Sequence, residues 1–520
     1  MAKAHAHAPP RQCSHERSHV VNSAFHGGGY STPDSRRIFC DVCRLQRWLD
    51  VEVALAVSQA ELGMIPYEAA NVIRKSARIE RLDHAAIKAG IAKMGHSLVP
   101  LLRALQKILT SYAAQYVHHG ATTQDIQDTG QALEMRDVLD LVELQVVALL
   151  DRLDELAADN REQLTVGRTH AQPALPTTFG LKVAGWIDEL TRHVVRIREA
   201  RPRLLVAQLA GGVGTMAAFQ GRGVELLTRF AGHLGLGVPD VGWHVSRDRV
   251  AEFIFLLAAV SASLARAADE IRLLCRPEFA ELEERWDPGR LGSSTMPHKR
   301  NPENAEQIVV LARLARAQVP LGLECMILEH ERDYRGTRLE WPAVEAVSHY
   351  TLTALSFMSV VLESITVRRS NMEGTARELA DLACTEALAF LLGQRIGHAK
   401  AFIIIHRLSQ DAIDRKKSVL ECALANHELN LVLDQATIEE IFEPASYLGS
   451  AGELVDRVLA TRRQVCATRP AAQAAAQAAA QAAPQTQAAA QATAQAAAQA
   501  APQAAAQAVP MAAARPEKIA

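Results

Sequence analysis

Residues 292–302 read Gly-Ser-Ser-Thr-Met-Pro-His-Lys-Arg-Asn-Pro, and their types and spacing suit acid–base chemistry. Glycine allows the backbone an open course, and Asn301-Pro302 is typical of a helix start, with Asn301 as the N-cap. The pattern predicts a mobile loop that leads into a helix from Glu303 to about Val319. Serine is a poor base unless its alkoxide is stabilised. Lys299 and the positive end of that helix could stabilise the alkoxide of Ser293.

Two further runs could act with this loop. The run 167–174, Gly-Arg-Thr-His-Ala-Gln-Pro-Ala, contains His170, and a histidine can hand a proton to a leaving group near neutral pH. Taken alone, His170 would more often be a structural, hydrogen-bonded histidine. The run 119–129, His-Gly-Ala-Thr-Thr-Gln-Asp-Ile-Gln-Asp-Thr, taken alone reads as a Ser/Thr/Asp turn.

Together the three runs resemble the signature motifs of the fumarase/aspartase superfamily. The form of the loop, with His298 and Arg300, resembles the branch that holds adenylosuccinate lyase and 3-carboxy-cis,cis-muconate cycloisomerase. By this resemblance Ser293 is the catalytic base and His170 is the general acid. The resemblance also implies that the Thr-Thr-Gln segment, Thr122 to Gln124, binds a substrate carboxylate through hydroxyls and backbone amides.

The reaction implied by the resemblance starts with removal of a proton from the carbon next to a carboxylate. The carbanion is stabilised as an aci-carboxylate, and the group on the neighbouring carbon then leaves, usually giving fumarate. Such a dianionic intermediate needs preorganised donors and cations. The residues expected around it are Thr122, Thr123, Gln124, Ser294, Lys299 and Asn301. Arg335 and Arg338 are further candidates to bind a second carboxylate, and no metal ion or organic cofactor is implied.

Several positions depart from the adenylosuccinate lyase pattern. His96 falls where those enzymes carry a substrate-contacting histidine, but Ser97 stands where they usually have aspartate. Gly29 replaces an arginine that helps to hold the nucleotide phosphate, and Thr337 and Trp341 align with a phosphate-binding serine and arginine. Losing cationic side chains removes the strongest contacts that a phosphate site can make. The sequence therefore argues against a nucleotide substrate.

Three functions remain open on these grounds. The first is a fumarate-forming carbon–nitrogen lyase acting on a small, non-nucleotide amino- or nitrosuccinate, which the departures favour over adenylosuccinate lyase. The second is cycloisomerisation of 3-carboxymuconate, favoured by the runs 243–249 and 445–451. The third is a non-catalytic, crystallin-like protein, against which the intact Ser293, His170 and Lys299 argue.

Composition restricts the partners. The 520 residues are 49 % hydrophobic and 22 % charged with a net charge of −2, which indicates a soluble globular protein without a nucleic-acid or anionic-membrane surface. The longest strongly apolar run, 253–265, is too short to span a bilayer, and residues 1–10 lack a signal core, so we expect a cytoplasmic protein. Cys40 and Cys43 form the only Cys-x-x-Cys, without the second pair that a zinc site needs.

The hydrophobic pattern is helical nearly throughout and predicts an all-α protein. The longest predicted helices are Leu133–Asp159, Phe179–Arg201, Arg247–Cys275, Glu303–Val319 and Ala343–Ile365. We expect five segments: a flexible arm (1–28), an N-terminal helical domain (29–115), a central long-helix bundle (116–365), a C-terminal helical domain (366–464) and an Ala/Gln-rich tail (465–520). The resemblance implies the three-domain fold of a homotetramer whose active sites each combine motifs from three subunits and bind a small dicarboxylate.

Overall fold

The computed structural model describes residues 20–286, 289, 291–379, 381 and 384–467. The described chain is predominantly helical, with two short two-stranded antiparallel sheets, which confirms the predicted all-α class. Most of the predicted N-terminal arm (1–19) and most of the Ala/Gln-rich tail (468–520) lie outside the described residues.

Short and medium helices precede the first long one. They are α1 (Pro33–Phe39), α2 (Asp41–Glu61), α3 (Tyr67–Ser76), α4 (His84–Met94), α5 (Val99–Ile108) and α6 (Ser111–Ala114), with 3-10 turns at Val20–Asn22, Gly27–Gly29 and Ile79–Arg81.

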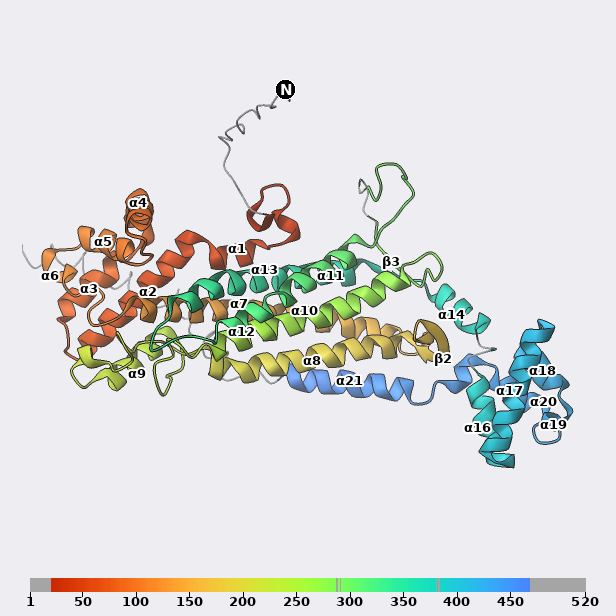
Figure 1. Ribbon diagram of the computed structural model, residues 1–520. Coiled ribbons are helices and arrows are strands. Elements are labelled where there is room, and N and C mark those ends of the chain that lie inside the picture. The colour runs from red at the N-terminus through yellow and green to blue at the C-terminus, as the bar shows by residue number, and fades with distance from the viewer. Residues whose placement is uncertain (1–19, 287–288, 290, 380, 382–383, 468–520) are drawn as a thin grey trace, which may run out of the picture. The chain divides into compact units, whose positions relative to one another are not determined.

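Long helices make up the middle of the chain. They are α7 (Thr123–Asp159), α8 (Phe179–Leu204), α10 (Asp248–Leu274), α11 (Glu303–Arg316) and α13 (Tyr334–Ser364), with the shorter α9 (Gly223–Leu234), α12 (Val319–Glu324) and a 3-10 turn at Ala217–Phe219 between them. These long helices pack side by side in a bundle (Figure 1), in which α10 contacts α8, α11 and α13, and α7 contacts α8 and α13.

The last helices are shorter again. They are α14 (Arg369–Glu378), α16 (Thr385–Ile396), α17 (His398–Arg415), α18 (Val419–Ala425), α19 (His427–Asn430), α20 (Gln435–Ile441) and α21 (Ala451–Ala467), with a 3-10 turn at Pro444–Tyr447. The helices α16 to α20 enclose a hydrophobic core of their own, and a second core lies between α2, α5, α7 and α9. The division into domains at the predicted boundaries stays a prediction.

The helix α10 is apolar on several faces because it is surrounded by other helices. It is also long and apolar enough to cross a membrane, but 67 % of its most apolar stretch is buried inside the protein. Such burial is typical of the central helix of a soluble bundle.

Several predicted helix ends are confirmed and others are wrong. Phe179 and Glu303 begin α8 and α11 as predicted. The helix α7 begins at Thr123 rather than Leu133, because a polar stretch is buried and hydrogen-bonded as the first turns of the helix. The helix α13 begins at Tyr334 rather than Ala343, and Pro342 lies inside it.

Both sheets lie near loops that carry site residues. The strands β1 (Leu164–Thr169) and β2 (Gln172–Thr178) form a hairpin between α7 and α8, which the helical pattern did not predict. The strand β3 (Leu282–Glu284) pairs with β4 (Ile365–Val367), which directly follows α13. The β3–β4 pair therefore anchors the start of the loop that contains Ser293 to the C-terminal end of α13.

Candidate active site

In the loop that carries Ser293, the backbone at Gly292 packs closely against the backbone at Lys299. A side chain at Gly292 would collide with the carbonyl oxygen of Lys299 and lie 2.6 Å from the ring of Trp286, so only glycine fits there. The side-chain amide of Asn301 donates to the Gly292 carbonyl oxygen at 2.7 Å and closes the loop. Sequence reasoning expected an N-cap at Asn301, and this expectation is wrong because the amide bridges the loop instead.

The oxygen of Ser293 points at backbone donors. Its Oγ accepts hydrogen bonds from the N–H groups of Met296 at 3.0 Å and Thr295 at 3.3 Å. Two such donors favour negative charge on this oxygen. Lys299 is exposed, and within the described residues its ammonium group has no hydrogen-bond or ion-pair partner. Ser294 on the same loop is exposed as well, and Ser293 is half-buried.

The N-terminus of α11 does not serve Ser293 as expected. The buried carboxylate of Glu284 accepts hydrogen bonds from the backbone N–H groups of Ala305 at 3.0 Å and Asn304 at 3.4 Å, and from the Asn304 amide at 3.1 Å. A carboxylate in this position neutralises the positive end of the helix. The positive end of α11 is therefore already matched by a carboxylate.

His170 lies at the tip of the β1–β2 hairpin. His170 and Ala171 both have positive φ angles, 52° and 62°, as a two-residue type I′ turn requires. Near the turn, Arg168 donates to the buried carboxylate of Glu281 at 2.5 Å and so ties this end of the hairpin to residue 281. The histidine is exposed and has no partner among the described residues, so its ring is available to a substrate or to another chain.

A second group of predicted residues meets at the start of α7. His96 Nδ1 accepts from the backbone N–H of Val99 at 3.1 Å, which leaves Nε2 facing Thr123 Oγ1 at 3.4 Å. Both residues line a cavity of about 250 Å³, together with Gln124 and Arg332. The rest of the lining consists of Gly95, Ser97, Gln127, Tyr334 and Thr337. A cavity with several neutral and cationic donors suits a carboxylate.

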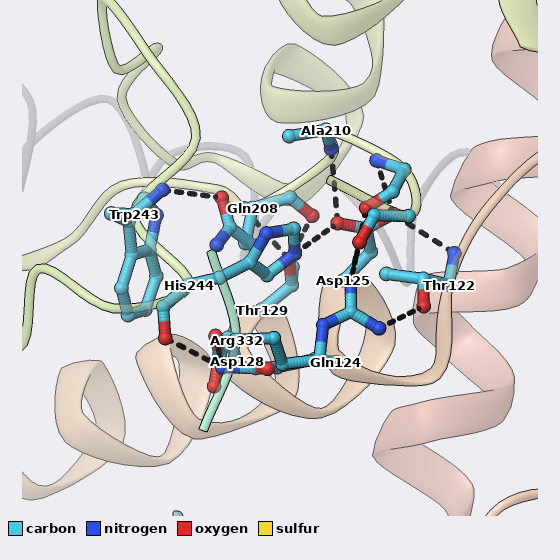
Figure 2. Close-up of polar contacts among 12 residues, drawn as sticks. Thr122, Gln124, Asp125, Asp128, Thr129, Gln208, Ala210, Trp243, His244 and Arg332 are labelled. Atoms are coloured by element: carbon cyan, nitrogen blue, oxygen red, sulfur yellow. Dashed lines mark hydrogen bonds and ion pairs between the residues drawn. The ribbon is translucent and has the colours of Figure 1, made fainter. Parts of the chain in front are cut away.

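The carboxylate of Asp125 holds this region together (Figure 2). It is fully buried and accepts from His244 Nε2 and the Ala210 N–H, each at 2.9 Å, and from the N–H groups of Thr122 and Gly211, each at 3.0 Å. Four donors saturate the two carboxylate oxygens. Asp125 therefore joins Thr122 to the loop 207–212.

Arg332 spans the same two segments from the other side. Its guanidinium donates to Thr122 Oγ1 at 2.7 Å and to the carbonyl oxygens of Gly212 at 2.7 Å and Gly211 at 3.1 Å (Figure 2). All of these acceptors are neutral, so no carboxylate in the described part of the chain pairs with its charge. An unneutralised guanidinium beside a cavity favours an anionic ligand.

A buried ion cluster fixes the three helices behind the cavity. Arg247, the residue just before α10, donates to Asp128 on α7 at 2.8 Å and to Glu340 on α13 at 2.5 Å, and all three side chains are buried. Asp128 also accepts from the amide of Gln124 at 3.1 Å. The cluster thereby fixes the side chain of Gln124 relative to α10 and α13.

The two arginines singled out from the sequence have different surroundings. Arg335 pairs with Asp333 at 2.5 Å and with Glu329 at 2.9 Å, and the Arg335 guanidinium holds the pKa of the Asp333 carboxyl far below its usual range. Its charge is thus already neutralised. Arg338 lies over the ring of Tyr334, with 4.5 Å between its Cζ atom and the ring centroid.

One chain does not bring all predicted site residues together. The cavity lies at the N-terminus of α7, whereas the hairpin with His170 follows its C-terminus, and a helix of 37 residues is about 55 Å long. The Ser293 loop starts from the β3–β4 pair at the far end of α13 from Arg332. Figure 1 shows the hairpin and β3 near the same end of the bundle.

Sequence reasoning missed Asp125, His244, Arg332 and Tyr334. Asp125 and His244 are far apart in the chain, and no local pattern links them. Arg332 precedes Thr337 and Trp341 in the chain, but no sequence pattern there distinguishes it from Arg335. Only the positions of their neighbours separate the two arginines.

Comparisons with known proteins agree with the motifs. Residues 29–317 match the family model described as Lyase, and residues 381–458 match the one described as Adenylosuccinate lyase C-terminus. The N-acetyl-S-(2-succino)cysteine lyase of Dickeya dadantii is 34 % identical over 442 residues, which are 85 % of this chain and 97 % of that protein. The adenylosuccinate lyase of Methanocaldococcus jannaschii is 35 % identical, over 83 % of this chain and 94 % of that protein.

A solved structure gives the same result. The fold is similar to that of 3-carboxy-cis,cis-muconate lactonizing enzyme from Pseudomonas putida, with a TM-score of 0.78 and 34 % identity. The likeness covers 84 % of this chain and 98 % of that one.

Proposed function

Because the chain belongs to the fumarase/aspartase superfamily of lyases, we propose that it releases fumarate from a small 2-substituted succinate that carries no phosphate. The observation that carries the proposal is the signature loop, in which Ser293 Oγ receives two backbone N–H groups beside the unpaired Lys299. A serine in this setting can remove a proton from the carbon next to a carboxylate.

The other site residues have complementary roles in this proposal. Thr123 and His96 bind one substrate carboxylate in the cavity, and Arg332, which donates a hydrogen bond to Thr122, supplies positive charge. Asn301 keeps the loop closed while Lys299 stabilises the dianionic intermediate. The exposed ring of His170 protonates the leaving group where the leaving group needs a proton.

Two residues support a substrate without a phosphate group. Gly29 offers no side chain, and Trp341 packs against Trp48 with 6.1 Å between the ring centroids. Neither can make the charge-assisted contacts that hold a phosphate. Adenylosuccinate is therefore the less favoured substrate, although adenylosuccinate lyases are among the relatives.

We propose sulfur as the leaving atom. The relative from Dickeya dadantii is named for a succinyl thioether. In this reaction Ser293 takes a proton from the CH₂ carbon, the C–S bond breaks with its electron pair on sulfur, and fumarate and a thiol result once sulfur gains a proton. Nitrogen, as in an amino- or nitrosuccinate, is the second candidate, since adenylosuccinate lyases cleave off a nitrogen leaving group.

A substrate panel tests the proposal. Purified protein is incubated with S-(2-succino)-N-acetylcysteine, N-substituted aspartates, nitrosuccinate, adenylosuccinate and 3-carboxymuconate, while fumarate absorbance is followed. We expect fumarate from the thioether and none in the Ser293→Ala control. Fumarate only from a nitrogen compound would select the second candidate. Conversion of 3-carboxymuconate alone, without fumarate release, would establish a cycloisomerase and overturn the proposal.

The assembly is part of the proposal. Since His170 and the cavity lie at opposite ends of α7, we propose that a homotetramer completes each site with residues from different subunits. A cytoplasmic location agrees with a small metabolic substrate and likewise stays a proposal.

A further inference from the structure

Three arginines, at positions 332, 335 and 338, lie just before α13 or in its first turns, and they differ in the groups that contact their guanidinium. Arg335 is paired with carboxylates, and Arg332 donates to neutral oxygens. Arg338 has neither kind of contact: among the described residues no carboxylate, carbonyl or hydroxyl oxygen accepts a hydrogen bond from it. Its guanidinium is exposed, and the donors in its plane are free.

Aromatic rings fix the position of this guanidinium. Its Cζ atom lies 4.5 Å from the ring centroid of Tyr334 and 5.6 Å from that of Trp341. These residues are four before and three after Arg338, so all three share one face of α13. Trp341 is itself held by Trp48 and by Arg44, whose Cζ atom is 5.7 Å from the Trp341 ring. Stacking limits the motion of the arginine without using its hydrogen-bond donors.

The stacked arginine lies beside the cavity that is proposed to bind substrate. Tyr334 lines that cavity together with Arg332, Thr123 and His96. Only the ring of Tyr334 therefore separates Arg338 from the succinyl group that is proposed to bind in the cavity. The part of the substrate that extends beyond the succinyl carbons is the leaving group.

We propose that Arg338 binds a carboxylate on the leaving group and so selects amino-acid-like leaving groups. This inference rests on the proposed function. The preferred substrate then has three carboxylates: two on the succinyl moiety and a third on the departing thiol or amine. A planar guanidinium with two parallel N–H donors matches a carboxylate in bidentate fashion. Nitrite and ammonia lack such a group and are poor leaving groups for this site.

Two matched thioethers test the inference. S-(2-succino)-N-acetylcysteine carries the third carboxylate, and S-(2-succino)-N-acetylcysteamine differs from it only in having hydrogen there. We expect wild-type kcat/KM to favour the first compound about 10- to 100-fold, the usual effect of a charged hydrogen bond. Arg338→Met should remove this preference, chiefly through a higher KM for the compound that carries the third carboxylate.

Two further variants complete the experiment. Arg338→Lys keeps the charge but loses the bidentate geometry, so it should retain part of the preference. Arg203→Met removes another exposed arginine, paired with Glu252 at 2.6 Å on the bundle surface, and should keep the wild-type preference.

The outcomes separate this inference from the function on which it rests. If wild-type protein uses both compounds equally, or if Arg338→Met slows both by the same factor, Arg338 does not bind the carboxylate of the leaving group. The proposed lyase function would still stand. If neither compound and no other succinyl compound in the panel yields fumarate, the proposed function itself fails.

Discussion

At the scale of single residues, the proposed chemistry depends on the groups that surround one serine oxygen, Ser293 Oγ. Ser293 Oγ receives N–H groups from Thr295 and Met296, and the carboxylate of Glu284 already occupies the nearby helix terminus. In the proposed mechanism, stabilisation of the alkoxide therefore depends on the loop and on Lys299 more than on the macrodipole of α11.

Ser293→Ala should lower kcat by about two to four orders of magnitude, because it deletes the proposed base. The loop is exposed and the change is small, so the thermal unfolding temperature should match that of the wild type. Steady-state kinetics and thermal unfolding measure the two effects. A folded variant that keeps more than about a tenth of the activity would place the base elsewhere.

His170→Ala should reveal the leaving atom. An amine must be protonated to leave, so its release should slow by about 10²- to 10⁴-fold without the general acid. A thiolate or nitrite departs as an anion and should be affected much less, provided that binding survives. The measurement compares kcat for thioether, amine and nitro substrates in the same variant. An equal, complete loss with every substrate would contradict this role for leaving-group acidity.

At the scale of elements, polar contacts between helices tie stability to pH. His193 on α8 is buried, and its Nε2 lies 2.8 Å from Ser263 Oγ on α10. Ser263 in turn donates to Glu189 at 2.6 Å, so its hydroxyl hydrogen is used and His193 is the donor of this pair. Burial, assisted by the positive charge of Arg196, lowers the pKa of His193 to about 4.

The pH dependence follows from that shift. The folded protein binds this proton less readily than the unfolded chain, whose histidine has a pKa of about 6.5. The stability contribution is therefore complete above about pH 6.5 and declines as the pH falls towards 4. Urea unfolding at a series of pH values should show the stability of the wild type falling relative to His193→Gln over this range. Parallel curves for the two proteins would show that His193 does not titrate in this way.

At the scale of the whole molecule, the length of α7 separates the functional groups. About 55 Å of helix lies between the cavity and the hairpin, so one chain cannot place His170 over a substrate in its own cavity. The general acid must then come from another copy of the chain if both groups act on one substrate.

Mixing Ser293→Ala protein with His170→Ala protein should restore part of the activity, measured with a substrate that requires both residues. Mixed oligomers would contain some sites with both an intact serine and an intact histidine. Each variant alone, taken through the same mixing procedure, is the control. If subunit exchange is demonstrated and activity stays absent, active sites are not shared in the proposed way.

The sequence by itself determined the fold class, the family motifs and several helix ends. Phe179 starts α8 as predicted, and Thr178 just before it caps the helix, which is a local signal. Glu303 also starts α11 as predicted, although the N-cap expected at Asn301 is wrong. The same locality explains why the Ser293 loop could be recognised without the structure. Gly292, which has no room for a side chain, and Asn301, which closes the loop, both lie within the same eleven-residue run.

Only the tertiary structure decided the features that depend on distant partners. The start of α7, taken alone, reads as a polar turn in the sequence, yet it is a buried helix in which Thr129 bonds Gln208, Asp125 bonds His244, and Asp128 bonds Arg247. The hairpin puts His170 at a positive φ angle that no helical pattern predicts. Three arginines within seven residues look alike in sequence, but Arg335 pairs with carboxylates, Arg332 donates to neutral oxygens, and Arg338 lies over an aromatic ring. Buried polar groups and surface charges take their roles from residues that are remote along the chain, so local patterns do not reveal them.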